Sequence, residues 1–201
     1  MDKIKISVMT GKMKDIPAIN TNPLSNPFCQ KMHNTKAKNI VCKECYSYSM
    51  LNTYRKNCVP AFEHNTNILK NKISKKQIPL FKKNDIVRIH AHGELINEQH
   101  LLNFMDIAKE NETITFSLYT KRSDIVNKVL EKSEKPNNMI LVYSNPVVDK
   151  PIHNIPAGFD KVFNVCRTAH LDKINCGAKS CNTCRSCYTK TGANIIYEAI
   201  K

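Results

Sequence analysis

The sequence predicts an α/β fold with a mostly parallel sheet, either open or closing into a partial barrel, and helices packed against it. Between Asp85 and Cys166, segments with the two-residue periodicity of a strand alternate with segments of helical periodicity. Helical segments of this length are typical of right-handed crossovers between parallel strands. With 201 residues, the chain is long enough for one domain with a sizeable core.

The predicted domain spans residues 1–201 and has three parts. These are a cysteine-rich N-terminal segment (1–58), an α/β core (60–166) and a cysteine-rich C-terminal segment (167–201). In the first part, the two Asn-Pro pairs of "NTNPLSNPFC" are typical of a loop. A short strand is predicted from Lys3 to Met9 and a helix from Cys45 to Tyr54, whereas the rest of this part is expected to be irregular.

The core begins with a predicted helix over 60–73, in which Pro60 suits the first turn. Predicted strands follow in "DIVRIHAHGEL", "TITFSLYT", "NMILVYSN" and "DKVFNVC". Between the first three lie two predicted helices, "NEQHLLNFMDIAKENE" and "SDIVNKVLEKSE", with Asn97 and Ser123 as their N-caps. The C-terminal segment is expected to be a loop that closes with a short helix or strand.

Charge and hydropathy indicate the cellular compartment of the protein and the classes of partner that it can bind. No apolar run approaches the roughly 20 residues that cross a bilayer, and no secretory signal is apparent, so the sequence predicts a cytoplasmic protein without a membrane partner. The formal net charge is +14, which makes nucleic acid a candidate partner through a basic surface. The lysines are scattered, however, as the coding bias of an AT-rich genome would also produce.

Nine cysteines are the most unusual feature of the composition. In a reducing cytoplasm, clustered cysteines indicate metal binding or redox chemistry more than disulfides. The candidate metal ligands form two groups, the early cysteines Cys29, Cys42 and Cys45, and the late cysteines Cys176, Cys181, Cys184 and Cys187. The late group has the spacing C-x4-C-x2-C, extended by a further x2, and the C-x4-C-x2-C part occurs in plant-type ferredoxins.

Thiolates are soft ligands that suit an iron–sulfur cluster or zinc. We expect the N-terminal and C-terminal loops to converge on a metal centre at the sheet edge, either one shared centre or two adjacent ones, with Cys42, Cys45, Cys184 and Cys187 as the principal cofactor ligands. The C-x2-C pairs lie too far apart for a zinc ribbon, which favours a [4Fe-4S] cluster and leaves zinc as the alternative or a second metal. The C-x3-C-x2-C motif of radical S-adenosylmethionine enzymes is absent.

The predicted strand "IVRIHAHGE" carries a second candidate site. Strand alternation would place Arg88, His90, His92 and Glu94 on one face. Polar residues in such a row require partners, a ligand or water. They form either a buried structural network or a catalytic pocket in which histidine and glutamate transfer protons.

In their order along the chain, several motifs resemble those of the gene-product-88-like family of phage proteins. They are "CKECY", "PAFEHNTNIL", "RIHAHGE", "SLYTKR" and "CNTCRSCY". The resemblance implies that six cysteines recur (Cys29, Cys42, Cys45, Cys181, Cys184 and Cys187), as do Arg88, His90, Gly93 and Glu94. It also implies a viral metal or iron–sulfur protein that acts inside the host cell, and it favours His90 over His92.

These observations lead to one main functional expectation and two alternatives. The main expectation is a phage [4Fe-4S] protein with esterase-like hydrolase activity on a small-molecule substrate, at a pocket lined by His90, His92, Glu94 and Arg88. The first alternative is a nucleic-acid-binding protein whose ends are held together by zinc or a cluster. The second is a redox or electron-transfer protein.

Overall fold

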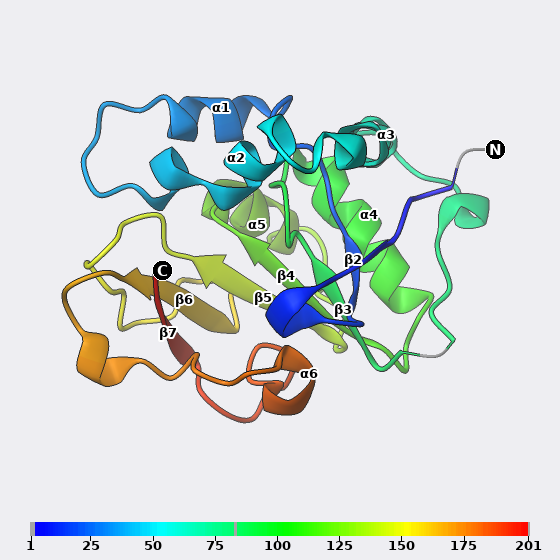
Figure 1. The fold of residues 1–201 in the computed structure, drawn as a ribbon. Coiled ribbons are helices and arrows are strands. Elements are labelled where there is room, and N and C mark those ends of the chain that lie inside the picture. Colours follow the sequence, from blue (N-terminus) through cyan, green and yellow to red (C-terminus); the bar gives the residue numbers. More distant parts are fainter. Residues whose placement is uncertain (1–2, 83, 201) are drawn as a thin grey trace.

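The computed structural model describes residues 3–82 and 84–200, so the ends of the predicted first and last segments lie outside the described residues. Within the described ranges, seven strands form one sheet in the order of the sequence (Figure 1). They are β1 (Ser7–Val8), β2 (Pro17–Ile19), β3 (Ile86–Ile89), β4 (Thr115–Thr120), β5 (Met139–Ser144), β6 (Lys161–Cys166) and β7 (Ile195–Ala199). Only β1 pairs antiparallel, which confirms the predicted mostly parallel α/β fold. Parallel strands that follow one another in sequence order are typical of a β/α barrel. In the described residues, however, β1 and β7 are the two edges of the sheet and do not pair with each other.

Six α-helices accompany the sheet in the described part of the chain. They are α1 (Pro27–His33), α2 (Tyr46–Asn52), α3 (Val59–Leu69), α4 (Glu98–Lys109), α5 (Ser123–Leu130) and α6 (Cys181–Cys184). Asn97 caps α4 as predicted, since its side chain accepts a hydrogen bond from the His100 amide at 2.9 Å. The predicted cap at Ser123 is wrong, because Ser123 is the first residue of α5 and the side chain of the preceding Arg122 makes no capping hydrogen bond.

Two elements of the N-terminal segment were not predicted. Strand β2 has only three residues, too few to show an alternating pattern. Helix α1 follows an Asn-Pro pair that resembles a loop, yet Asn26 caps it by accepting hydrogen bonds from the amides of Phe28 and Cys29. Pro27 then occupies the first turn, where it loses no helical hydrogen bond.

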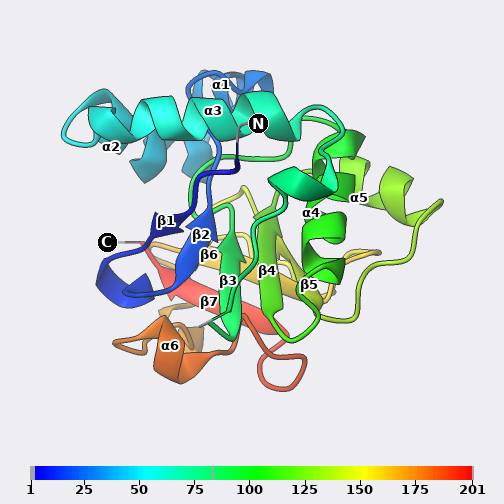
Figure 2. The same ribbon diagram turned by 90° about the vertical axis from the view of Figure 1, so that its right-hand side faces the viewer.

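The hydrophobic core lies between one face of the sheet and helices α3, α4 and α5. It includes Val87 and Ile89 of β3, Phe116 and Leu118 of β4, and Phe104 of α4, all with no exposed surface. Figure 2 shows α4 and α5 together on one side of the sheet. Alternation along β3 and β4 therefore directs every second side chain into this core.

We call the opposite side of the sheet its inner face. Here Tyr119, Ile140 and Val142 pack with Cys187, while Ile86 packs with Tyr188. The covering residues come from the connection between β6 and β7, which crosses from one end of the strands to the other and contains α6. Figure 2 shows α6 on the side away from α4 and α5.

The two ends of the strands are covered by different parts of the chain. In both views, α1, α2 and α3 lie at one end of the sheet and α6 lies at the other. Asn26 Nδ2 donates to the Glu94 carbonyl at 2.9 Å, which fixes α1 beyond the carboxyl end of β3. Arg185, beside α6, pairs with Asp85 at the amino end of β3. No helix in the described ranges is long and apolar enough to cross a membrane.

Candidate functional site

The four residues expected on one face of a strand do not share a face. Strand β3 ends at Ile89, and His90 adopts a left-handed backbone conformation with φ of 59°. Gly93 has φ of 97°, and a β-carbon there would lie 2.6 Å from the carbonyl oxygen of Thr21. The alternation therefore stops after Arg88, and the prediction of a common face was wrong because the strand is shorter than its apolar pattern suggested.

Arg88 alone lies on the inner face. Its guanidinium carbon is 3.2 Å from the centroid of the Tyr119 ring, in a cation–π contact. Its Nε is buried and has no hydrogen-bond partner among the described residues. Arg88 also interacts electrostatically with Tyr188 and Cys187, which places a cation next to the late cysteines.

His90 and His92 point to different parts of the fold. The His90 ring packs edge-on against His100 and Phe104 of α4, and burial lowers its pKa well below the ordinary value. The His92 ring lies against Phe62, and its Nδ1 is 2.7 Å from Ser47 Oγ. Burial lowers the pKa of His92 to about 4. Both imidazoles are therefore neutral near pH 7. They lack the additional ring proton that a histidine donates when it acts as a general acid.

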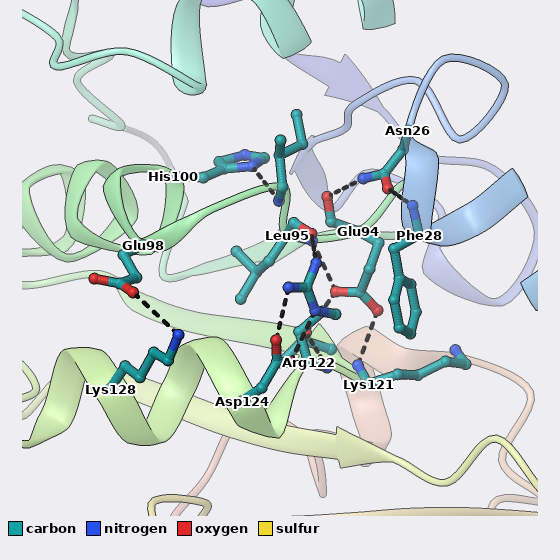
Figure 3. A network of polar contacts seen from close by, with 12 residues as sticks. Asn26, Phe28, Glu94, Leu95, Glu98, His100, Lys121, Arg122, Asp124 and Lys128 are labelled. Carbon is teal, nitrogen blue, oxygen red and sulfur yellow. Dashed lines mark hydrogen bonds and ion pairs between the residues drawn. The ribbon is translucent and has the colours of Figure 1, made fainter. Parts of the chain in front are cut away.

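Glu94 joins the ends of two neighbouring strands. Its carboxylate accepts a hydrogen bond from the Lys121 amide at 2.8 Å and another from the Thr120 hydroxyl (Figure 3). It also accepts one from the Leu95 amide at 2.8 Å. Burial raises the pKa of Glu94, although the Lys121 ammonium and these hydrogen bonds oppose the shift. These hydrogen bonds fix the Glu94 carboxylate to the loop that follows β4.

The early cysteines come together at the carboxyl ends of β3, β4 and β5. Cys29 lies in α1, Cys42 lies in the short 3-10 helix η2 (Val41–Glu44), and Cys45 follows it. Burial raises the pKa of the Cys29 thiol, and Glu94, Cys42 and Cys45 raise it further by electrostatic interaction.

Lys121, which sequence reasoning did not select as a site residue, lies among the early cysteines. Burial alone would lower its pKa, but interactions with Cys42, Glu94, Cys45 and Cys29 raise the pKa above the ordinary lysine value. Its ammonium donates to Ser144 Oγ at 3.1 Å. The available signal was its position directly after the strand "TFSLYT", because side chains at the carboxyl ends of parallel strands face one common edge.

The late cysteines surround a hollow at the amino ends of the strands. All four line one cavity of about 110 Å³, together with Lys12, Arg185 and Tyr188. Burial, followed by the charge of Glu198, raises the pKa of Cys176 to about 12. Hydrogen bonds from Ser186 instead lower the pKa of Cys184.

The two groups of cysteines are separate. The early cysteines interact with one another and with Lys121, whereas the late cysteines interact with one another, Lys12 and Arg88. The early group lies at the carboxyl ends of the strands and the late group at the amino ends, so the two loops do not converge on one shared centre. Among residues 3–82 and 84–200, no three His, Cys, Asp or Glu side chains are arranged to hold a single metal ion, so a metal centre stays a prediction.

The remaining cysteines, Cys58 and Cys166, belong to neither group. Cys58 precedes α3 and packs against a small core of Met50, Leu51 and Phe62. Cys166 ends β6 and is fully buried. All nine cysteines are free thiols.

The comparison with known proteins gives one match. The family model described as Gene product 88 matches residues 4–150. The matched range contains the early cysteines, the "RIHAHGE" segment and Lys121, and it ends before the late cysteines. No curated protein and no solved structure matches the chain. Since the match covers well over half of the sequence, the chain belongs to the Gene product 88 family.

Proposed function

We propose that this chain is a viral iron–sulfur protein whose late cysteines hold a [4Fe-4S] cluster for electron transfer. The observation that carries the proposal is the single cavity lined by Cys176, Cys181, Cys184 and Cys187. Four thiolates match the four irons of such a cluster, so each iron has a protein ligand and none is left open to a substrate. A centre that is closed in this way suits electron transfer.

The size of the cavity supports a cluster over a zinc ion. A single water needs about 10–15 Å³ of such space, so a cavity of about 110 Å³ has room for a group of several atoms. Zinc requires four sulfurs roughly 2.3 Å from one point.

The charges around the cavity also fit an anionic cluster. Four thiolates carry more negative charge than the cluster core carries positive charge, and buried charge is unfavourable unless it is compensated. Lys12 Nζ donates to the Cys176 carbonyl at 3.3 Å, and Arg88 interacts with Cys181 and Cys187. The high pKa of Cys176 means that the metal-free thiol is protonated at neutral pH and releases its proton when metal binds.

The hydrolase pocket expected from the sequence is not part of this proposal. Arg88 faces the inner side of the sheet, His90 faces α4 and His92 faces α2 and α3, so these side chains point in different directions, and hydrolase activity stays a prediction. Nucleic-acid binding through the basic surface stays a prediction, and a steep decrease in affinity with salt would reveal it.

Anaerobic purification followed by iron and acid-labile sulfide analysis tests the proposal. We expect both elements in the protein and a visible absorption that bleaches with dithionite. Cys184→Ser and Cys187→Ser should each lower the iron and sulfide content, whereas the matched control Cys58→Ser should not, because Cys58 packs outside both groups. A colourless protein with stoichiometric zinc would refute the cluster.

A further inference from the structure

We infer that the connection between β3 and α4 (residues 90–97) is an acid-sensitive latch that releases the helices over the carboxyl ends of the strands. Three buried histidines form the latch. His90 and His92 lie in the connection, and His100 lies in the first turn of α4. The inference is independent of the proposed function, because it uses no cysteine and no cluster. It describes a conformational change that is set by pH.

The connection joins several elements at the carboxyl ends of the strands. Asn26, the cap of α1, donates to the Glu94 carbonyl at 2.9 Å, and the Glu94 carboxylate accepts a hydrogen bond from the Lys121 amide at 2.8 Å (Figure 3). The Thr21 amide, just after β2, donates to the His92 carbonyl at 3.1 Å. Opening of the connection would therefore break the contacts that join α1, β2 and the end of β4.

His90 and His100 pack against each other within the core. Their ring centroids are 5.3 Å apart and their planes are nearly perpendicular, with Phe104 against both rings. Among the described residues, neither ring nitrogen of His90 has a hydrogen-bond partner, and neither does Nε2 of His100. A second proton on either ring would therefore be a buried charge without an acceptor, which is unfavourable.

The hydrogen bond that His100 accepts also requires a neutral ring. The Ile96 amide donates to His100 Nδ1 at 3.3 Å. An imidazole nitrogen accepts a hydrogen bond only when it carries no proton, so the proton of His100 lies on Nε2. Protonation of Nδ1 would place two N–H donors against each other. It would therefore weaken the attachment of the connection to α4.

His92 attaches the connection to the helices that cover this end of the sheet. Its ring stacks on Phe62 of α3 with the centroids 5.4 Å apart, and its Nδ1 is 2.7 Å from Ser47 Oγ of α2. These contacts bury the ring, which is 6% exposed. The connection thus contacts α4 through one histidine and contacts α2 and α3 through another.

The charged groups that interact with His90 and His92 are cations and disfavour a further positive charge. They are Arg88 of β3, Lys121 after β4 and Arg55 before the short helix η3 (Lys56–Cys58). Burial is the largest cause of the low pKa of all three histidines. The Tyr119 backbone raises the pKa of His90, but by less than burial lowers it. Below about pH 6.5 the open form therefore binds protons that the closed form excludes, and opening becomes more favourable.

Hydrogen–deuterium exchange at about pH 7.5 and about pH 5.5, corrected for the intrinsic exchange rates, tests the latch. Each histidine that binds its second proton only in the open form makes opening about tenfold more favourable over this range. We expect the protection of amides in residues 90–97 to fall about a thousandfold. At both pH values these amides should also exchange at least about tenfold faster than those of β4 and β5, because local opening breaks fewer contacts than global unfolding. Equal protection in the two regions would show that opening is global and would overturn the latch.

Substitutions separate the three histidines. His90→Asn, His92→Gln and His100→Gln should each reduce the pH dependence of exchange about tenfold, and the triple variant should lose nearly all of it. Asparagine suits the left-handed backbone at position 90. His153→Gln, at an exposed histidine, is the matched control and should keep the full pH dependence. If the three single variants keep it as well, or if the control loses as much as they do, the latch is wrong; the single variants decide even if the triple variant does not fold.

Discussion

The two groups of cysteines lie at opposite ends of one sheet and differ in what surrounds them. At the amino ends, the four late cysteines line a cavity in a connection with little regular structure. At the carboxyl ends, the early cysteines lie on α1 and η2, which hydrogen bonds tie to the ends of β3 and β5. The late thiols therefore face one common hollow, whereas the early thiols lie beside the Lys121 ammonium. The proposed late centre would therefore add order to a region that has little regular structure of its own.

The largest predicted effect is the loss of order in the late region when iron is removed. Between β6 and β7, only the short helices η5 (Leu171–Lys173) and α6 are regular in the described structure. We expect trypsin to cut the metal-free protein within residues 167–194 at least about tenfold faster than the iron-loaded protein, because such local opening requires few contacts to break. Limited proteolysis with mass spectrometry measures both rates. Equal rates in the two forms would show that metal does not order this region.

Substitution of Gly93 should destabilise the carboxyl end of the sheet. In Gly93→Ala the new β-carbon would lie 2.1 Å from Thr21 Oγ1, and the backbone φ of 97° is unfavourable for alanine. Together these effects should lower the free energy of unfolding by about 3 kcal/mol or more. Urea unfolding measures the change. Gly177→Ala is the control, because its β-carbon would have no neighbour within 4 Å, and an equal loss in both variants would contradict the account.

The buried histidines should make the protein less stable in acid. Burial lowers the pKa of His92 to about 4 and that of His100 to about 3, so below pH 6.5 the unfolded chain binds protons that the folded chain does not. Stability therefore decreases as the pH falls, by roughly 2 kcal/mol per histidine between pH 7.5 and pH 5. His100→Gln should reduce the dependence of unfolding free energy on pH by that amount. An unchanged dependence would show that His100 is protonated in the folded protein.

The smallest predicted effect concerns Arg88 and the late cluster. Removing this cation in Arg88→Met should lower the reduction potential by tens of millivolts, because a nearby positive charge favours the reduced, more negative cluster. Redox titration followed by visible absorption measures the potential. Arg122→Met, which removes a cation at the carboxyl ends of the strands, should leave the late potential unchanged. If Arg122→Met shifts the reduction potential of the late cluster more than Arg88→Met does, Arg88 is not the cation that acts on this cluster.

Much of the fold could be predicted from the sequence because its core has strong periodicity. The predicted strand "TITFSLYT" and the helix capped by Asn97 correspond to β4 and α4. The strand containing Arg88 was predicted too long, because residues that follow Ile89 continue a polar alternation while their backbone turns. Alternation in sequence cannot distinguish an extended segment from a turn that contains a left-handed residue.

The grouping of the cysteines could be predicted, but their arrangement could not. Short spacing places Cys42 near Cys45, and Cys181 near Cys184 and Cys187, whatever the fold. Which end of the sheet each group occupies depends on contacts distant in sequence, such as that of Asn26 with Glu94 and that of Arg185 with Asp85. The sequence places Lys121 directly after a predicted strand, but only the parallel register of β3, β4 and β5 brings it to the early cysteines.

Mössbauer spectroscopy of anaerobically purified protein labelled with ⁵⁷Fe tests the central claim most directly. The account predicts the spectrum of a [4Fe-4S] cluster in which every iron has a protein thiolate. Mononuclear iron alone, or no iron in a protein that carries stoichiometric zinc, would contradict it.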